Sequence, residues 1–407
     1  MPNTYDRMKT GTYALVTGAY WAFTLTDGAL RMLVLLYFHD LGYNPVSLAL
    51  LFVLYELFGV FTNLIGGWLG ARSGLHRTLV AGLGLQVLAL LALSLHSPSW
   101  REWLAVTWVM GAQALSGIAK DLTKMSSKTA VKFVSTEGTL FRFVALLTGS
   151  KNALKGGGFF LGAALLTWRG FDQSLWIMAA ALTAVLALTV VLVSPIGHAG
   201  AKPPFRQVAQ KSRAIKRLSL ARFFLFGSRD IWFVVALPVF LGDELGWSFY
   251  AIGAFLAIWV MAYGAVQAIA PALTGVFYDT RSAASGLLTP MAVVMAVIAI
   301  ATSTHQMQAL ATVMGLIVFG AMFAITSSVH SYLILAYSES DDETALDVGY
   351  YYSANAAGRL VGTILSGLLT LLGGFPAALV GAIAFLIAAL LVSSRLPEVK
   401  RRRVAMS

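Results

Sequence analysis

Lys151 and Lys155 lie in a stretch, residues 140–167, that contains no acidic residue. Residues four apart share one face of a helix, so we expect the two ammonium groups to point the same way. In a dry helix bundle they would repel each other, whereas a water-filled cavity that receives an anion would stabilise both. We therefore favour an anion-binding role over a structural one. Asn152 can hydrogen-bond the same substrate, or it can bond a neighbouring helix.

Other apolar stretches also contain ionisable side chains, five deep cations in all against three deep anions. A charge at the centre of a membrane-spanning helix costs about 2.5–3.5 kcal/mol on insertion scales, so each needs a partner, water or a function. The planar fork of arginine binds phosphate-like or carboxylate oxygens through two hydrogen bonds, and lysine adds a mobile point charge. The set predicts a site for a small, multiply charged oxyanion, with the ligands Arg31, Lys151, Asn152, Lys155, Arg229 and Arg359.

The deep acids are Asp27, Glu56 and Asp230, and two roles are open for them. Asp27 and Arg31 are four residues apart and can form an ion pair along one helix face, and Asp230 can offset a neighbouring cation. Alternatively, any of the three acids can carry a proton whose movement is coupled to transport. The sequence alone does not choose between these roles.

Lys120, Lys124, Lys128 and Lys132 recur every four residues and therefore share one helical face. A solvated or headgroup-touching extension of the helix is the more common use of such a face. The sharper alternative is an electrostatic funnel in which Lys120, Lys124 and Lys128 draw anions toward the inner mouth.

The elements that position these side chains are expected to be membrane helices. The chain has 407 residues, of which 58% are hydrophobic and only 12% charged, and its mean hydropathy is +0.76. Soluble chains contain about 25% charged residues. Cysteine is absent, which excludes thiolate metal sites and disulfides. No phosphate-binding loop or hydrolase motif is present, so we expect no cofactor, no metal and no enzyme activity.

Apolar runs separated by turn residues or charge clusters predict an all-α membrane protein, since backbone groups in lipid must be satisfied within the segment. The twelve predicted spans are residues 13–38, 46–70, 78–96, 103–121, 140–167, 173–194, 218–241, 248–272, 284–303, 309–332, 348–372 and 375–394.

Loop cations predict how these spans are oriented. With the N-terminus inside, nineteen lysines and arginines of the loops and tails fall on the cytoplasmic side and two, Arg101 and Arg169, on the other. This asymmetry predicts that both termini are cytoplasmic. The net charge of +11 is then explained by a lipid bilayer as partner, and no nucleic acid is expected.

The chain is predicted to consist of two similar halves. Residues 195–217 form the longest polar stretch, rich in proline, glycine and basic residues, and lie halfway along the chain. We therefore predict a six-helix half at 1–194, a basic cytoplasmic linker at 195–217, a second six-helix half at 218–394 and a basic tail at 395–407. Leu41-Gly42-Tyr43 and Leu245-Gly246-Trp247 recur 204 residues apart, as expected for duplicated transporter halves.

Two further stretches resemble the loop signature of the major facilitator superfamily, Gly-x-Leu-(Ala/Gly)-Asp-Arg-x-Gly. They are residues 67–74, with Gly67, Gly70, Arg72 and Gly74, and residues 275–281, with Asp279 and Arg281. The first copy has Ala71 at the acidic position, and the second is loose except for Asp279. The resemblance implies the twelve-helix major facilitator fold with these residues as a gating loop. A tight turn fixed by glycines is the alternative.

Four stretches resemble a particular branch, the organoarsenical efflux permeases called ArsJ. They are YWAFTLTDGALRM at 20–32, QALSGIAKDL at 113–122, LTGSKNALKG at 147–156 and FGSRDIWFV at 226–234. The resemblance extends over nearly the whole chain. It implies a multi-pass protein of the bacterial cytoplasmic membrane that exports 1-arseno-3-phosphoglycerate, an ester that a glyceraldehyde-3-phosphate dehydrogenase makes from arsenate. No stable complex with that enzyme is implied.

Other functions remain open at this point. The leading alternative is a proton-coupled exporter of another organic anion or of a drug. A membrane-embedded enzyme would need a catalytic constellation that the motifs do not provide, and a sensor would need a soluble signalling domain.

Overall fold

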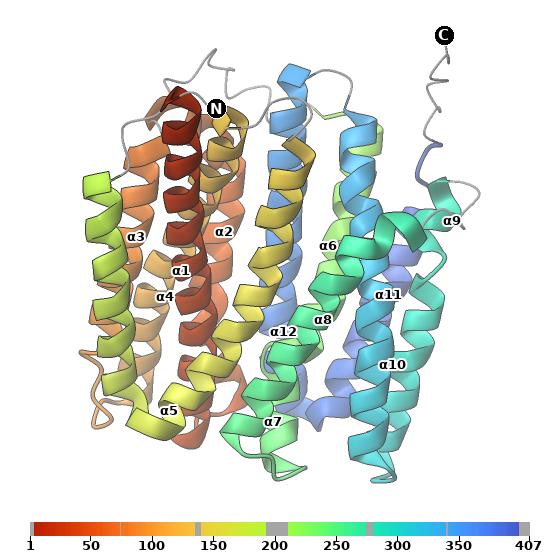
Figure 1. Cartoon of the computed structure of the whole chain (residues 1–407). Coiled ribbons are helices and arrows are strands. Elements are labelled where there is room, and N and C mark those ends of the chain that lie inside the picture. Colours follow the sequence, from red (N-terminus) through yellow and green to blue (C-terminus); the bar gives the residue numbers. More distant parts are fainter. Residues whose placement is uncertain are drawn as a thin grey trace.

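The structure is a computed structural model and describes residues 4–73, 75–134, 140–192, 211–273, 280–338 and 341–398. Within these ranges the chain forms a bundle of helices (Figure 1). The helices before the predicted linker are α1 (Thr4–Asp40), α2 (Pro45–Ser73), α3 (Leu75–Leu93), α4 (Glu102–Val134) and α5 (Leu140–Leu192). Those after it are α6 (Arg213–Phe233), α7 (Ala236–Asp243), α8 (Phe249–Leu273), α9 (Thr280–Ser285), α10 (Leu288–Ser303), α11 (Gln308–Tyr337) and α12 (Asp341–Ser393).

Two helices of 53 residues, α5 and α12, are bent by glycines. A straight helix of that length would measure about 80 Å, far more than the roughly 30 Å hydrocarbon core of a bilayer. Gly170 in α5 has φ 74° and Gly374 in α12 has φ 66°, a left-handed backbone that glycine adopts without steric cost. The chain reverses direction at the α5 bend (Figure 1). Both bends fall where two predicted spans meet.

The seventh predicted span is longer than the sequence indicated and is broken near its C-terminal end. Helix α6 begins at Arg213, inside the predicted linker, because Ser212 caps it by accepting a hydrogen bond from the backbone N–H of Ile215. The break between α6 and α7 exposes backbone donors. Ser366 Oγ accepts from the N–H groups of Val235 and Ala236 at 3.2 Å each, which satisfies them within the protein.

In the described part of the chain, nine helical segments are long and apolar enough to cross a membrane, and α4 is not among them. The helix α1 begins and α12 ends toward the same end of the bundle (Figure 1), as an even number of crossings requires. The count of twelve spans and the cytoplasmic placement of the termini stay predictions.

Small residues set the closest helix contacts. A Cβ at Gly158 of α5 would lie 2.5 Å from the carbonyl oxygen of Leu25 in α1. A Cβ at Gly362 of α12 would lie 2.7 Å from the carbonyl oxygen of Gly227 in α6. Gly158-x-x-x-Gly162 and Gly358-x-x-x-Gly362 therefore allow close contact between helices. The two motifs stand 200 residues apart, which supports the duplication.

The helices before and after the predicted linker, which we call the two halves, meet along two helix pairs, α2 with α12 and α5 with α8. A Cβ at Gly156 would lie 2.6 Å from the carbonyl oxygen of Ala257, so α5 and α8 touch backbone to backbone. On the other pair, Ser353 of α12 donates to the carbonyl of Val60 in α2 at 3.0 Å. These contacts bring α1, α5, α6, α8 and α12 around one central space.

The loop signature lies largely outside the described structure. Gly74 and Asp279 are outside the described residues. Gly67, Gly70 and Arg72 lie in α2 and Arg281 lies in α9, but their surroundings are not described either. Their gating role stays a prediction.

Candidate functional site

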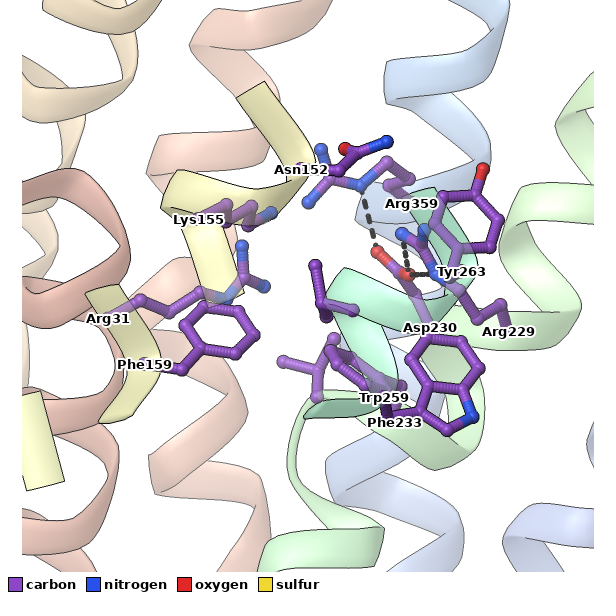
Figure 2. Close-up of a pocket in the computed structure, with 12 residues that line it drawn as sticks. Arg31, Asn152, Lys155, Phe159, Arg229, Asp230, Phe233, Trp259, Tyr263 and Arg359 are labelled. Atoms are coloured by element: carbon purple, nitrogen blue, oxygen red, sulfur yellow. Dashed lines mark hydrogen bonds and ion pairs between the residues drawn. The ribbon is translucent and has the colours of Figure 1, made fainter. Parts of the chain in front are cut away.

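A small cavity of about 50 Å³ lies between the two halves of the bundle. Its walls come from α1, α5, α6, α8 and α12, the helices that glycine contacts draw together. Figure 2 shows Arg31 and Lys155 on one side of it and Arg229, Asp230 and Arg359 on the other. Among the predicted ligands, Arg31, Asn152, Lys155, Arg229 and Arg359 line the cavity.

The charged side chains form a continuous alternating series, which we call the ion chain: Arg31, Glu56, Arg359, Asp230 and Arg229. Glu56 Oε1 accepts from Arg31 Nη1 at 3.0 Å and from Arg359 Nη2 at 2.6 Å. Asp230 Oδ2 accepts from Arg359 Nε at 2.9 Å, and Asp230 Oδ1 accepts from Arg229 Nε at 2.7 Å. The side chains of Glu56 and Asp230 are 1% exposed, and those of the three arginines are 12–15% exposed.

The expected pairing of Asp27 with Arg31 along one helix face is wrong. Tyr55 donates to both carboxylate oxygens of Asp27, at 2.8 and 3.0 Å, and Arg31 pairs instead with Glu56 on α2. A guanidinium bound to a carboxylate of another helix ties α1 to α2, which a pair along one helix could not do. The expectation that Asp230 offsets a neighbouring cation is confirmed, since it holds both Arg229 and Arg359.

Only one of the two lysines on α5 reaches the cavity. Lys155 lines it, whereas Lys151 is exposed and is not among the lining residues. Of the described residues, no carboxylate lies within ion-pairing distance of Lys155, and its Nζ lies 5.6 Å from the ring centroid of Phe159. Asn152 donates to Gln267 of α8 at 2.9 Å, so it makes the helix-to-helix bond that was its alternative role.

The cavity has an aromatic wall that the sequence did not reveal. Phe159, Phe233, Trp259 and Tyr263 line it, and the rings of Trp259 and Tyr263 stack at a centroid distance of 6.0 Å. Their spacing held a usable signal, because Trp259, Tyr263 and Gln267 recur every four residues and share one face of α8.

Arg222 is a buried cation that the list of deep charges omits. It is 4% exposed and lies over the ring of Phe226 at 3.8 Å. Its guanidinium donates to Asn355 Oδ1 at 2.9 Å and to the carbonyl oxygen and Oγ of Ser327 at 3.0 Å each. Neutral acceptors thus hold this arginine.

Lys120 and Lys124 pack against α2. The ammonium of Lys120 lies 3.9 Å from the ring centroid of Tyr55, and Lys124 Nζ donates to Asn63 Oδ1 at 2.7 Å and to Asp121 at 3.1 Å. A freely solvated face is therefore wrong for these two lysines. The surroundings of Lys128 are not described.

A contact between His39 and Asp243 joins the two halves at the end of the bundle where α1 and α7 end. His39 Nε2 lies 3.0 Å from Asp243 Oδ1, and these residues stand in the last turns of α1 and α7. A Cβ at Gly242 would lie 3.5 Å from the same ring nitrogen. The two halves are therefore in contact at this end of the bundle.

The arrangement suits an anion. Of the described residues around the cavity, Arg31, Lys155, Arg229 and Arg359 are cations, and Glu56 and Asp230 are the carboxylates that hold the three arginines. Two positive charges are in excess, and an incoming anion would offset them. A cavity of about 50 Å³ holds a few water molecules, so we expect it to widen when an organic anion enters.

Comparison with protein families gives one match. The profile described as Major Facilitator Superfamily matches residues 16–224, half of the chain. No curated protein matches the sequence.

Proposed function

Because the chain belongs to the major facilitator superfamily, we propose that it exports a small, multiply charged organic oxyanion by alternating access. As a member of this family it is a multi-pass membrane protein and a secondary transporter. The observation that carries the proposal is the convergence of four cations from both halves on one cavity, with two carboxylates to hold them. In alternating access the halves rock about such a central site.

The substrate we propose is 1-arseno-3-phosphoglycerate. It rests on the resemblance of residues 20–32, 113–122, 147–156 and 226–234 to the ArsJ permeases, and the chemistry of the cavity agrees with it. Phosphate, acyl ester and arsenate oxygens are acceptors for arginine and lysine. Pentavalent arsenic needs no thiolate ligand, which agrees with a chain that has no cysteine. The host would be a bacterium and the membrane its cytoplasmic membrane.

The membrane potential favours export of such an anion. A negative interior contributes about 2.3 kcal/mol per charge per 100 mV, so an ester with about three charges gains roughly 7 kcal/mol. Export then needs no ATP. Hydrolysis of the ester outside the cell would keep its outward gradient steep.

The test is uptake into everted membrane vesicles that contain the protein. A glyceraldehyde-3-phosphate dehydrogenase with arsenate outside the vesicles generates the ester, and the same enzyme with phosphate generates its ordinary counterpart. We expect arsenic to accumulate inside vesicles with the wild-type protein and at least tenfold less with Arg229→Met. Equal accumulation in vesicles without the protein would contradict the proposal.

A proton-coupled exporter of another organic anion or drug is the second candidate. The observation that favours it is Glu56 Oε2, a buried carboxylate oxygen without a hydrogen-bond donor among the described residues. A proton there would remove a charge from the centre of the ion chain. The same vesicles distinguish the two candidates, since collapse of the proton gradient at constant potential should leave the proposed export within about twofold of its initial rate.

A further inference from the structure

Two donors on the α1 and α5 side of the cavity lack an acceptor. Arg31 Nη2 is buried and has no hydrogen-bond partner among the described residues. Lys155 Nζ has no carboxylate within ion-pairing distance in the same part of the chain and lines the same cavity. Figure 2 shows the guanidinium of Arg31 and the ammonium of Lys155 pointing toward each other. Two cations that converge on one cavity without an acceptor are costly unless an anion comes between them.

The backbone fixes these two side chains side by side. A Cβ at Gly28 of α1 would lie 2.7 Å from the carbonyl oxygen of Lys155 in α5. The close contact therefore falls at Lys155 itself and one turn before Arg31. The separation of the two charges is set by packing of the main chain, and mutual repulsion cannot relieve it by moving the helices apart.

The opposite side of the cavity is different. Arg229 and Arg359 both bind Asp230, and Arg359 also binds Glu56. Arg31 is held through Nη1 alone, by a Glu56 oxygen that it shares with Arg359. An incoming anion thus finds unsatisfied donors on the α1 and α5 side first. On the other side it must compete with resident carboxylates.

We propose that Arg31 Nη2 and Lys155 Nζ form a subsite for a tetrahedral dianionic head group, phosphoryl or arsenyl, which every substrate of this carrier has in common. The subsite rests on the proposed function, because it uses the same cavity. The fork of Arg31 supplies directed hydrogen bonds to the oxygens of the head group, and Lys155 supplies a second positive charge. The rest of the substrate lies toward the aromatic wall, so selectivity resides in the head group.

The test is binding of inorganic phosphate, and separately of inorganic arsenate, to the purified full-length protein in detergent, measured by titration calorimetry at pH 8. We expect saturable binding of both ions by the wild-type protein. Arg31→Gln and Lys155→Gln should each weaken the affinity at least tenfold, because each removes a charged donor. Lys155→Arg, which keeps the charge, should bind within about threefold of wild type.

Arg169→Gln is the matched control, because Arg169 is a cation of the same helix that stacks on Trp168 at 3.9 Å and does not line the cavity. It should bind phosphate as the wild type does. Gel filtration checks that each variant is folded. If Arg31→Gln does not fold, the comparison of Lys155→Gln with Lys155→Arg tests the subsite. Absence of saturable binding in the wild type would overturn the subsite. Unchanged affinity in Lys155→Gln would overturn it as well.

The outcome separates the subsite from the proposed function. If the vesicles export the arsenylated ester but Lys155→Gln binds phosphate normally, the subsite is wrong and the function stands. If both ions bind as expected but the ester is not exported, the subsite stands and the substrate is another phosphoryl or arsenyl compound.

Discussion

Glu56 Oε1 lies 2.6 Å from Arg359 Nη2, although the two residues are 303 positions apart in the sequence. The same oxygen accepts from Arg31. A single carboxylate of α2 therefore holds a cation of α1 and a cation of α12, at the seam where the two halves meet. Separation of the halves has to break or remake this contact, so it connects charge in the cavity with movement of the bundle.

Glu56→Gln should destabilise the protein and impair transport. The glutamine amide oxygen can still accept hydrogen bonds at the Oε1 position. Its NH₂ group replaces Oε2, which accepts no hydrogen bond from the described residues, so the substitution mainly removes charge. Loss of one partner from a buried ion pair costs about 3–5 kcal/mol. Thermal unfolding in detergent is the measurement, with Glu102→Gln as a control, because Glu102 bonds Ser47 at an exposed position. A melting temperature equal to that of wild type would contradict a structural role for the bridge.

We expect Arg359→Gln to lose transport, and we expect Arg359→Lys to lose it as well. The guanidinium binds Glu56 through Nη2 and Asp230 through Nε at 2.9 Å, two acceptors on different helices. A lysine is a single point charge and cannot hold both in that geometry. Initial rates of arsenic uptake into everted vesicles provide the readout, and we expect both variants to fall at least tenfold. Wild-type rates in Arg359→Lys would show that charge alone suffices.

Lys155→Met and Lys151→Met should separate the two lysines that the sequence treats alike. Lys155 lines the cavity and Lys151 does not, so we expect at least tenfold loss of uptake in the first variant and less than threefold in the second. Arsenate resistance of cells that carry each variant, with the amount of protein in the membrane measured in parallel, checks this. Equal loss in both would mean that the cavity extends to Lys151 during transport.

The spacing of Lys151 and Lys155 shows how far sequence reasoning reaches. Their common face was predictable from helix geometry. The four residues between them also advance the helix by about 6 Å and rotate it by about 40° past a full circle, which is enough to move Lys151 away from a cavity that Lys155 lines. It was also predictable that Asp230 would pair with a cation, since a charge deep in the membrane needs a partner. The structure shows that its partners are Arg229 and Arg359.

Partners on distant helices were not predictable from spacing. Asp27 has Arg31 four residues away and yet accepts a hydrogen bond from Tyr55 on α2, because helix packing places the Tyr55 hydroxyl 2.8 Å from Asp27 Oδ1. The bends at Gly170 and Gly374 agree with the predicted loops, since a helix of 53 residues has to fold back on itself in a bilayer. The break in the helix after Phe233 is stabilised by Ser366, which lies 131 residues beyond Val235. The sequence around Phe233 does not predict this break.

Gly158→Ala and Gly362→Ala should each destabilise the bundle. The added Cβ would lie 2.5 Å from the carbonyl oxygen of Leu25 in the first case and 2.7 Å from that of Gly227 in the second, closer than backbone atoms allow. Overpacking of this kind costs about 1–3 kcal/mol. Gly111→Ala is the matched control, because nothing lies within 4 Å of a Cβ there. Thermal unfolding should show lower melting temperatures for the first two variants and no decrease for the third.

The contact between His39 and Asp243 should open and close during transport, and the lack of cysteine makes this directly testable. The native chain contributes no thiol, so a protein with both His39→Cys and Asp243→Cys has only two thiols. They lie at the ends of α1 and α7, where His39 Nε2 and Asp243 Oδ1 are 3.0 Å apart in the native protein. A short bifunctional thiol reagent with a reducible linker should join the halves there and stop arsenic uptake into everted vesicles. Reductant should restore it. Each single variant treated with the same reagent controls for modification alone. Undiminished uptake by the cross-linked protein would mean that the two ends stay together throughout the cycle, and the opening that releases substrate would then have to lie elsewhere.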